Sequence, residues 1–214
     1  MQAEHEHESD NQHAHGHRHL LGGRAFEVGF AVSMLFGRGG MARTIADLAD
    51  LTDSDVVVDV GCGPGTAVRR ARRAGAGRAV GVDPSPQMVR LGRWVNALRR
   101  VDGIDLVEGS AEHLPLEGHS ATVVWAIQSV HHWADRRRGL EEALRVLEPG
   151  GRLIFLEGYA EPGTRGRAKH GSTEAQAGEL QSLVASAGFV DVERRLVRVG
   201  RKNFTAITAS APLP

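Results

Sequence analysis

Two adjacent histidines in the segment QSVHHWAD, residues 128–135, are the first candidates for chemistry. Histidine has an ordinary pKa of about 6.5, which suits a general base, so His131 and His132 are candidate catalytic residues. A metal site is not indicated, because neighbouring side chains on a helix point about 100° apart, whereas helical histidine ligands stand four residues apart. No cysteine or carboxylate stands at ligand spacing around them. The segment therefore predicts either a general base or a structural turn between a strand and a helix.

A glycine-rich turn and a later aspartate form a second candidate site. In VVVDVGCGPGT, the glycines Gly61, Gly63 and Gly65 follow a β-branched run, and glycine allows both a sharp turn and the close approach of a ligand. Asp83 ends the next apolar run, where an acid can accept hydrogen bonds from both ribose hydroxyls of an adenosine group. The alternative for Asp83 is a helix-capping role before Pro84. Together the turn and the acid favour a ligand that contains a nucleoside.

The elements that must position these residues follow from hydrophobic patterning. Short apolar runs predict strands, and amphipathic stretches between them predict helices. The predicted strands cover residues 55–60, 78–83, 104–110, 121–128, 152–157, 190–200 and 203–210. The helix after the second strand is expected to begin with Ser85 as N-cap and Pro86 as its first residue. Its buried stripe is expected at Met88, Leu91, Val95 and Leu98.

Strands that alternate with helices predict an α/β fold with a doubly wound, mostly parallel sheet. The last two predicted strands follow each other directly, so we expect antiparallel pairing there and a seven-stranded, Rossmann-like sheet with an antiparallel last strand. Ligands of such sheets bind at the carboxyl ends of the strands. We expect one domain at residues 20–214, with a helical cap at 20–51 and a core at 52–214, after a disordered, histidine-rich tail at 1–19.

Composition limits the class of protein. Among the 214 residues, Lys+Arg and Asp+Glu both total 26, so bulk charge favours neither a nucleic acid nor a membrane surface. The single cysteine, Cys62, allows no intramolecular disulfide and fits a reducing compartment. The run AFEVGFAVSMLF is too short to span a bilayer, and the first residues lack the apolar core of a secretory signal. We therefore expect a cytoplasmic protein with no nucleic-acid and no membrane partner.

Five segments, taken in order, resemble the successive motifs of the class I S-adenosylmethionine-dependent methyltransferases, in their small-molecule, methyltransferase type 11-like branch. They are VVVDVGCGPG, AVGVDPSPQMV, VEGSAEHLPL, VVWAIQSVHHWAD and LRVLEPGGRLIFLE. The resemblance covers roughly residues 50–160. It implies S-adenosylmethionine as the cofactor and in-line attack of a small-molecule acceptor on the sulfonium methyl, with no metal required.

The resemblance also implies which residues hold the cofactor. Asp59 and the glycine loop would lie along its methionine and ribose portions, Asp83 would take the ribose hydroxyls, and Gln128 would contact the methionine portion. Ser110 stands where many members have an aspartate that accepts from the adenine amino group, and a hydroxyl can still accept there. The complete set of expected cofactor residues is Asp59, Gly61, Cys62, Gly63, Gly65, Asp83, Pro84, Ser85, Met88, Ser110, Ala111, Glu112 and Gln128.

Several alternatives remain open at this point. The acceptor pocket is expected to include Phe26, Phe30 and Trp133, although each could instead be ordinary packing. The protein could bind S-adenosylmethionine as an idle regulatory or scaffold subunit. An NAD-dependent oxidoreductase is less favoured, because Thr66 stands where a dinucleotide motif has glycine. Nucleic-acid methylation is disfavoured, because AIQS replaces the motif of the exocyclic-amine methylases, and because Cys62 stands in the glycine loop and not after the fourth strand, where a cytosine-C5 methylase would need its nucleophile. Monomer and homodimer are both compatible with the sequence.

Overall fold

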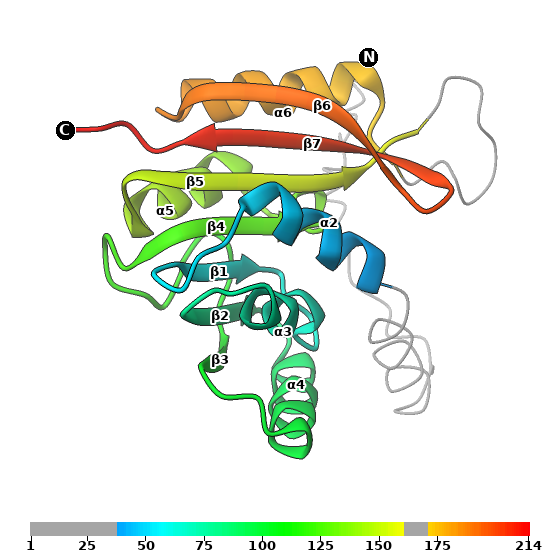
Figure 1. Cartoon of the computed structure of the whole chain (residues 1–214). Helices are drawn as coiled ribbons and strands as arrows, with labels where there is room; N and C mark the ends of the chain where they lie inside the picture. The colour runs from blue at the N-terminus through cyan, green and yellow to red at the C-terminus, as the bar shows by residue number, and fades with distance from the viewer. Residues whose placement is uncertain (1–37, 161–170) are drawn as a thin grey trace, which may run out of the picture.

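A seven-stranded sheet with helices on both faces forms the framework of the protein (Figure 1). The computed structural model describes residues 38–160 and 171–214. The strands are β1 (Val56–Val60), β2 (Arg78–Asp83), β3 (Ile104–Glu108), β4 (Ala121–Ile127), β5 (Leu147–Gly158), β6 (Val190–Val199) and β7 (Lys202–Ser210). The helices are α2 (Gly39–Ala49), α3 (Thr66–Arg73), α4 (Pro86–Arg99), α5 (Arg136–Val146) and α6 (Glu174–Ser186), with a 3-10 turn, η1 (Val130–His132).

The strand order is β3-β2-β1-β4-β5-β7-β6. β1 pairs in parallel with β2 and β4, and the parallel part continues to β3 on one side and β5 on the other. β7 is antiparallel to both of its neighbours, β5 and β6. The predicted fold class, with its antiparallel last strand, is therefore confirmed. Because β1, β2, β4 and β5 run in the same direction, their carboxyl ends meet at one edge of the sheet.

Two apolar cores cover the two faces of the sheet. Val58 and Val60 point toward α5 and α6, whereas Val57 points toward α2 and α3, as alternation along a strand requires. Figure 1 shows α2 and α3 in front of the sheet and α5 and α6 behind it. Asp59 lies in register with Trp125, so it belongs to the face covered by α2 and α3. Of the helical cap expected at 20–51, the described part is α2, which begins within GRGG.

The face that α4 buries differs from the expected stripe. Ser85 caps this helix as predicted, its Oγ accepting from the backbone N–H of Met88 at 3.4 Å. The buried residues, however, are Val89, Gly92 and Val95, and Leu98 is 69% exposed. Gly92 explains the rotation, because a Cβ there would lie 2.4 Å from the Leu106 side chain. The helix thus packs through its smallest residue.

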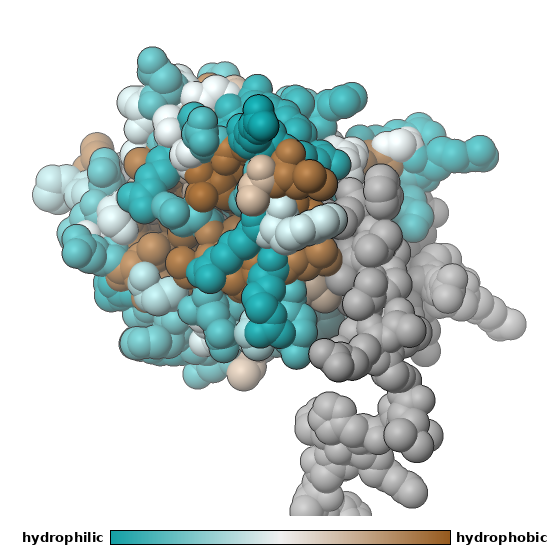
Figure 2. Space-filling view, turned by 90° about the horizontal axis from the view of Figure 1, so that it is seen from below, coloured by the Kyte–Doolittle hydropathy of each residue, from teal (hydrophilic) through white to brown (hydrophobic). Residues whose placement is uncertain are grey.

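The surface at the β3 edge is mixed in character. Figure 2 views this end of the molecule and shows apolar surface interspersed with hydrophilic side chains. Trp94, at 63% exposure, and Leu98 contribute apolar side chains from α4. None of the described helices is long and apolar enough to cross a membrane.

Candidate active site

The glycine loop joins β1 to α3 at the carboxyl edge of the sheet. Gly61, Gly63 and Gly65 have φ angles of 76°, 54° and 76°, a region that side chains with a Cβ rarely adopt. A Cβ on Gly61 would lie 2.5 Å from Cβ of Ser129, so the loop also packs tightly against the segment that follows β4. Ser129 adds a hydrogen bond there, its Oγ donating to the carbonyl of Val60 at 2.6 Å. The loop therefore needs glycine for both its conformation and its packing.

Asp83 fixes this loop from the end of β2. Its Oδ2 accepts from the backbone N–H of Gly63 at 2.7 Å, and its Oδ1 accepts from the N–H of Ser85 at 2.9 Å. The residue is only 8% exposed. Each carboxylate oxygen can accept a second hydrogen bond. The N-cap of the following helix is Ser85 and not Asp83, and the two contacts of Asp83 leave capacity for the ribose hydroxyls that it is expected to bind.

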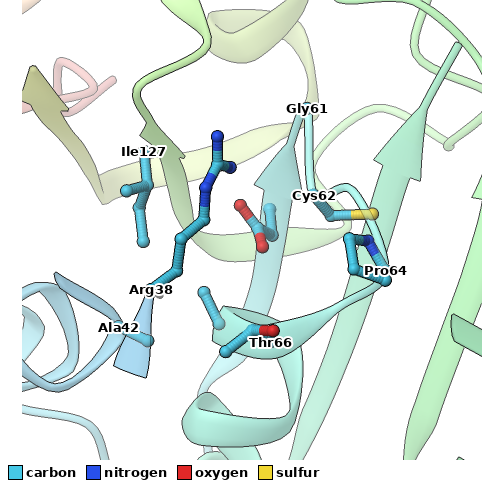
Figure 3. A pocket seen from close by; sticks show the side chains of 9 residues that line it. Arg38, Ala42, Gly61, Cys62, Pro64, Thr66 and Ile127 are labelled. Carbon is cyan, nitrogen blue, oxygen red and sulfur yellow. The ribbon is translucent and has the colours of Figure 1, made fainter. Parts of the chain in front are cut away.

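A small pocket opens beside the loop, between the start of α2, the end of β1 and the start of α3 (Figure 3). Its lining residues are Arg38, Ala42, Asp59, Gly61, Cys62, Pro64, Thr66, Ala67 and Ile127. Figure 3 shows the side chain of Arg38 extending from α2 between Ile127 and the loop that carries Gly61 and Cys62. The pocket thus brings together expected cofactor residues and an arginine that the sequence analysis missed.

Three polar side chains, Arg38, Asp59 and Thr66, line the pocket. Asp59 is 2% exposed, and burial raises the pKa of its carboxyl to about 7, against the opposing effect of the Arg38 charge. Burial lowers the pKa of Arg38, while Asp59, Asp83 and Glu157 act in the opposite direction. Within the described part of the chain, the hydroxyl of Thr66 is buried with no hydrogen-bond partner. The Thr66 hydroxyl is therefore available to a polar ligand.

Cys62 lines the pocket but does not supply a reactive thiolate. Its side chain is buried, and burial raises the pKa of the thiol well above its ordinary range. The Sγ donates to the carbonyl of Gly63 at 3.3 Å. A Cβ on Gly81 would lie 2.7 Å from this sulfur, so the thiol is packed against β2.

The expected adenine residues lie at the ends of β2 and β3. Ala111 is buried in the core on the α5 side, and Ser110 forms an isolated β-bridge with His113. Glu112 accepts from the backbone N–H of Asp135 at 3.2 Å. Burial alone would raise the pKa of Glu112, but hydrogen bonds from backbone groups and from Ser110 lower it overall. The Glu112 carboxylate therefore ties the loop after β3 to the end of the QSVHHWAD segment.

The QSVHHWAD segment leaves β4 through a strained residue. Gln128 has a φ of 49°, which is uncommon for a residue with a side chain and is often found at functional sites. Its Nε2 lies 3.6 Å from Sδ of Met41 on α2. This places the Gln128 side chain on the same face of the sheet as the pocket. Its expected contact with the cofactor stays a prediction.

The two histidines have different surroundings. Nδ1 of His131 lies 2.7 Å from Oε2 of Glu157, a glutamate at the end of β5. The ring of His132 contacts that of His131 at a tilt of 48°, with ring centroids 4.0 Å apart. Burial lowers the pKa of His132, and the neighbouring His131 acts in the same direction. Across the described residues, no group of three or more His, Cys, Asp and Glu side chains is arranged to hold a metal ion.

Trp133 makes a core contact. Its ring meets Phe155 edge-on at 5.5 Å, and a Cβ on Gly139 would lie 2.5 Å from the indole. This is the packing role that the sequence had left as the alternative to a place in the acceptor pocket. The other two expected pocket residues, Phe26 and Phe30, lie outside the described residues.

Arg38 and Glu157 were not among the site residues expected from the sequence. Glu157 carried a usable signal, because it ends a buried apolar run as Asp83 does. Nothing in the spacing around Arg38 distinguished it from the other arginines, since its place in the pocket depends on how α2 docks on the sheet.

Comparison with known proteins gives the family. Residues 58–155 match the methyltransferase domain family. The demethylmenaquinone methyltransferase of Symbiobacterium thermophilum is 40% identical over 109 residues, which cover 48% of this chain and 42% of that protein. The 27-O-demethylrifamycin SV methyltransferase of Amycolatopsis mediterranei is 34% identical over 112 residues, which cover 52% of this chain and 41% of that protein.

The structural comparison agrees with these matches. A SAM dependent methyltransferase from Aquifex aeolicus superposes with a TM-score of 0.71 at 18% identity, over 86% of this chain and 97% of that one. The matches over residues 58–155 support a methyltransferase domain of the class I, S-adenosylmethionine-dependent type, with S-adenosylmethionine as its cofactor. The matched segment spans less than half the length of the two curated relatives.

Proposed function

We propose that the protein transfers a methyl group from S-adenosylmethionine to a small-molecule acceptor. The observation that carries the proposal is the set of polar groups in the pocket beside the glycine loop. Arg38 offers a positive charge, Thr66 offers a buried hydroxyl with no partner among the described residues, and Asp59 offers a buried carboxyl. A cation and a hydroxyl donor opposite an acid match the carboxylate and the ammonium of an amino acid.

The residues present therefore fit the methionine end of the cofactor. Arg38 and Thr66 would hold its carboxylate, and Asp59 would hold its ammonium. The glycine loop packs closely at Gly65, because a Cβ there would lie 3.2 Å from the Leu106 side chain. Asp83 would hold the ribose hydroxyls. Pro84, Met88 and Ala111 would lie along the adenine.

The chemistry divides simply between cofactor and protein. The cofactor supplies a methyl group on a sulfonium, which is an electrophile that needs no further activation. The chain supplies binding and alignment of the acceptor at the carboxyl edge of the sheet. Gln128 and the two histidines lie at that edge, next to the loop that carries Gly61.

The relatives support a small acceptor. Two of them are named for small molecules, a demethylmenaquinone and a demethylrifamycin. The equal numbers of acidic and basic residues add no bulk attraction for nucleic acid. We expect the protein to act in the cytoplasm.

Titration calorimetry tests the cofactor assignment. We expect binding of S-adenosylmethionine and of its demethylated product, S-adenosylhomocysteine, and no binding of NAD. Arg38→Ala should weaken binding of the cofactor by about tenfold or more, the effect of losing one charge-assisted hydrogen bond. Arg43→Ala is the matched control, because Arg43 is an exposed arginine of the same helix. Equal effects of the two substitutions, or binding of NAD alone, would overturn the assignment.

Turnover separates an enzyme from an idle binding subunit. Methyl-labelled cofactor is incubated with phenols, carboxylates and amines, and label in any of them establishes transfer. Tight cofactor binding with no transfer to any acceptor would instead favour the idle subunit that the sequence left open.

A further inference from the structure

A single buried carboxylate organises the segment that carries the two histidines. Oε1 of Glu157 accepts from the backbone N–H groups of Ser129 and Val130, both at 3.1 Å. Its Oε2 lies 2.7 Å from Nδ1 of His131. Glu157 is 4% exposed, and a carboxylate at that depth needs its oxygens hydrogen-bonded. Glu157 therefore holds both the backbone of η1 and the ring of His131.

This contact selects one form of the His131 ring. A carboxylate oxygen only accepts, so Nδ1 must carry the proton. Nε2 of the neutral ring is then left with a free lone pair, the form that takes a proton from a substrate. The His131 side chain is 38% exposed, so part of the ring is open to solvent. No side-chain hydrogen bond orients His132 among the described residues, and its ring makes a tilted contact with His131.

The Glu157–His131 pair lies beside the pocket. Glu157 is one of three carboxylates whose charge acts on Arg38, together with Asp59 and Asp83. Ser129, which donates its N–H to Glu157, also packs against Gly61 of the glycine loop. The histidine that is held in a defined form is therefore adjacent to the residues that would hold the cofactor.

We propose that Glu157 positions His131 as the general base and that the acceptor is a hydroxyl compound of the phenol type. The proposal rests on the proposed function. The acceptor oxygen forms a bond to the methyl carbon while the bond between methyl and sulfur breaks, and its electron pair stays on sulfur. The hydroxyl proton passes to Nε2 of His131, where Glu157 stabilises the imidazolium, and then leaves to solvent. A neutral amine attacks with its own lone pair and needs no such base, which is why this arrangement favours a hydroxyl acceptor.

Nitrogen-15 NMR of the full chain tests the positioning without any acceptor. We expect the Nδ1–H form of His131 in the wild-type protein. Glu157→Gln keeps an oxygen for Ser129 and Val130, but its NH₂ group can only donate, so it should shift His131 toward the Nε2–H form. A purely structural carboxylate would change the melting temperature and not the ring form. Glu141→Gln is the matched control, because Glu141 is 44% exposed and pairs only with surface arginines among the described residues.

Single-turnover rates test the role of the pair. The probes are catechol, 4-hydroxybenzoate and benzylamine, with labelled S-adenosylmethionine. We expect transfer to a phenol, and a rate about 100-fold lower in Glu157→Gln and in His131→Gln, with cofactor affinity within about threefold of wild type. His131→Gln leaves the backbone contacts of Glu157 in place, so it controls for misfolding.

Three results would overturn the proposal. They are an Nε2–H ring in the wild-type protein, a wild-type rate in either variant, or transfer to benzylamine with none to the phenols. Failure of wild-type protein to bind S-adenosylmethionine is a separate outcome, because it would remove the proposed function and this proposal with it.

Discussion

Replacing Asp59 by asparagine should stabilise the protein at alkaline pH while weakening cofactor binding. Burial raises the pKa of Asp59 from its ordinary value of 3.8 to about 7. Between these two pH values the unfolded carboxyl is ionised while the folded one keeps its proton. The folded state therefore binds more protons, and the free energy of unfolding falls as pH rises through this window. At 1.36 kcal/mol per pKa unit, the cost of the carboxylate reaches about 4 kcal/mol above pH 7.

The asparagine variant has no such titration. We therefore expect the stability of Asp59→Asn relative to wild type to rise by about 4 kcal/mol between pH 4 and pH 8. Urea unfolding at several pH values gives the free energy of unfolding of each protein. The other titrating groups are common to both proteins, so their contributions cancel when the wild-type value is subtracted from that of the variant. Asp105→Asn is the control, because Asp105 is 52% exposed and its pairing with Arg78 is on the surface. The free energy of unfolding of Asp105→Asn relative to wild type should not change over this pH range.

Cofactor binding should move in the opposite direction. Loss of the charge that would face the ammonium should weaken affinity for S-adenosylmethionine about tenfold or more at pH 8. Affinity in the wild-type protein should rise with pH through about 7, because the ionised form binds the ammonium. Two results would refute the assignment of Asp59 as a buried acid that binds the cofactor. One is a free energy of unfolding of Asp59→Asn, relative to wild type, that stays constant between pH 5 and pH 8, and the other is wild-type affinity for S-adenosylmethionine in the variant.

Two further substitutions test the loop. Asp83→Ala should weaken binding of S-adenosylmethionine by at least about tenfold in calorimetry, and unchanged affinity in a folded variant would contradict the ribose assignment. Gly61→Ala should destabilise the protein by about 2–4 kcal/mol in urea unfolding, since it combines a positive φ with a contact 2.5 Å from Cβ of Ser129. Ser129→Gly should recover part of that loss, and an absence of any recovery would show that packing at this contact is not the cause.

Local pattern was sufficient for the framework of the fold. The strands and their order of appearance follow from short β-branched runs, and the position of the loop with Gly61 follows from its glycines and the strand before it. Asp83 could be singled out because the end of a parallel strand is a defined place in such a sheet. These features depend on residues close together in the sequence.

The features that were missed depend on tertiary contacts. The face of α4 is set by the fit of Gly92 against Leu106, a contact that helical periodicity cannot reveal. The role of Glu157 comes from a hydrogen bond to His131, a residue on the other side of α5 in the sequence. Arg38 enters the pocket only because α2 packs over β4 and β5. Sequence pattern thus indicated the region of the candidate site but not Arg38 and Glu157, which the fold brings beside it.

The place of β7 has a consequence for the order in which the chain can assemble. β7 is the last strand in sequence, yet it lies between β5 and β6 and hydrogen-bonds to both. Until it is synthesised, β5 has a free edge and β6 has no partner strand. During translation the five-stranded part of the sheet formed by β3, β2, β1, β4 and β5 can form first, while β6 must wait. Loss of β7 would therefore detach β6 and expose the edge of β5, so this strand is much less tolerant of deletion than an edge strand.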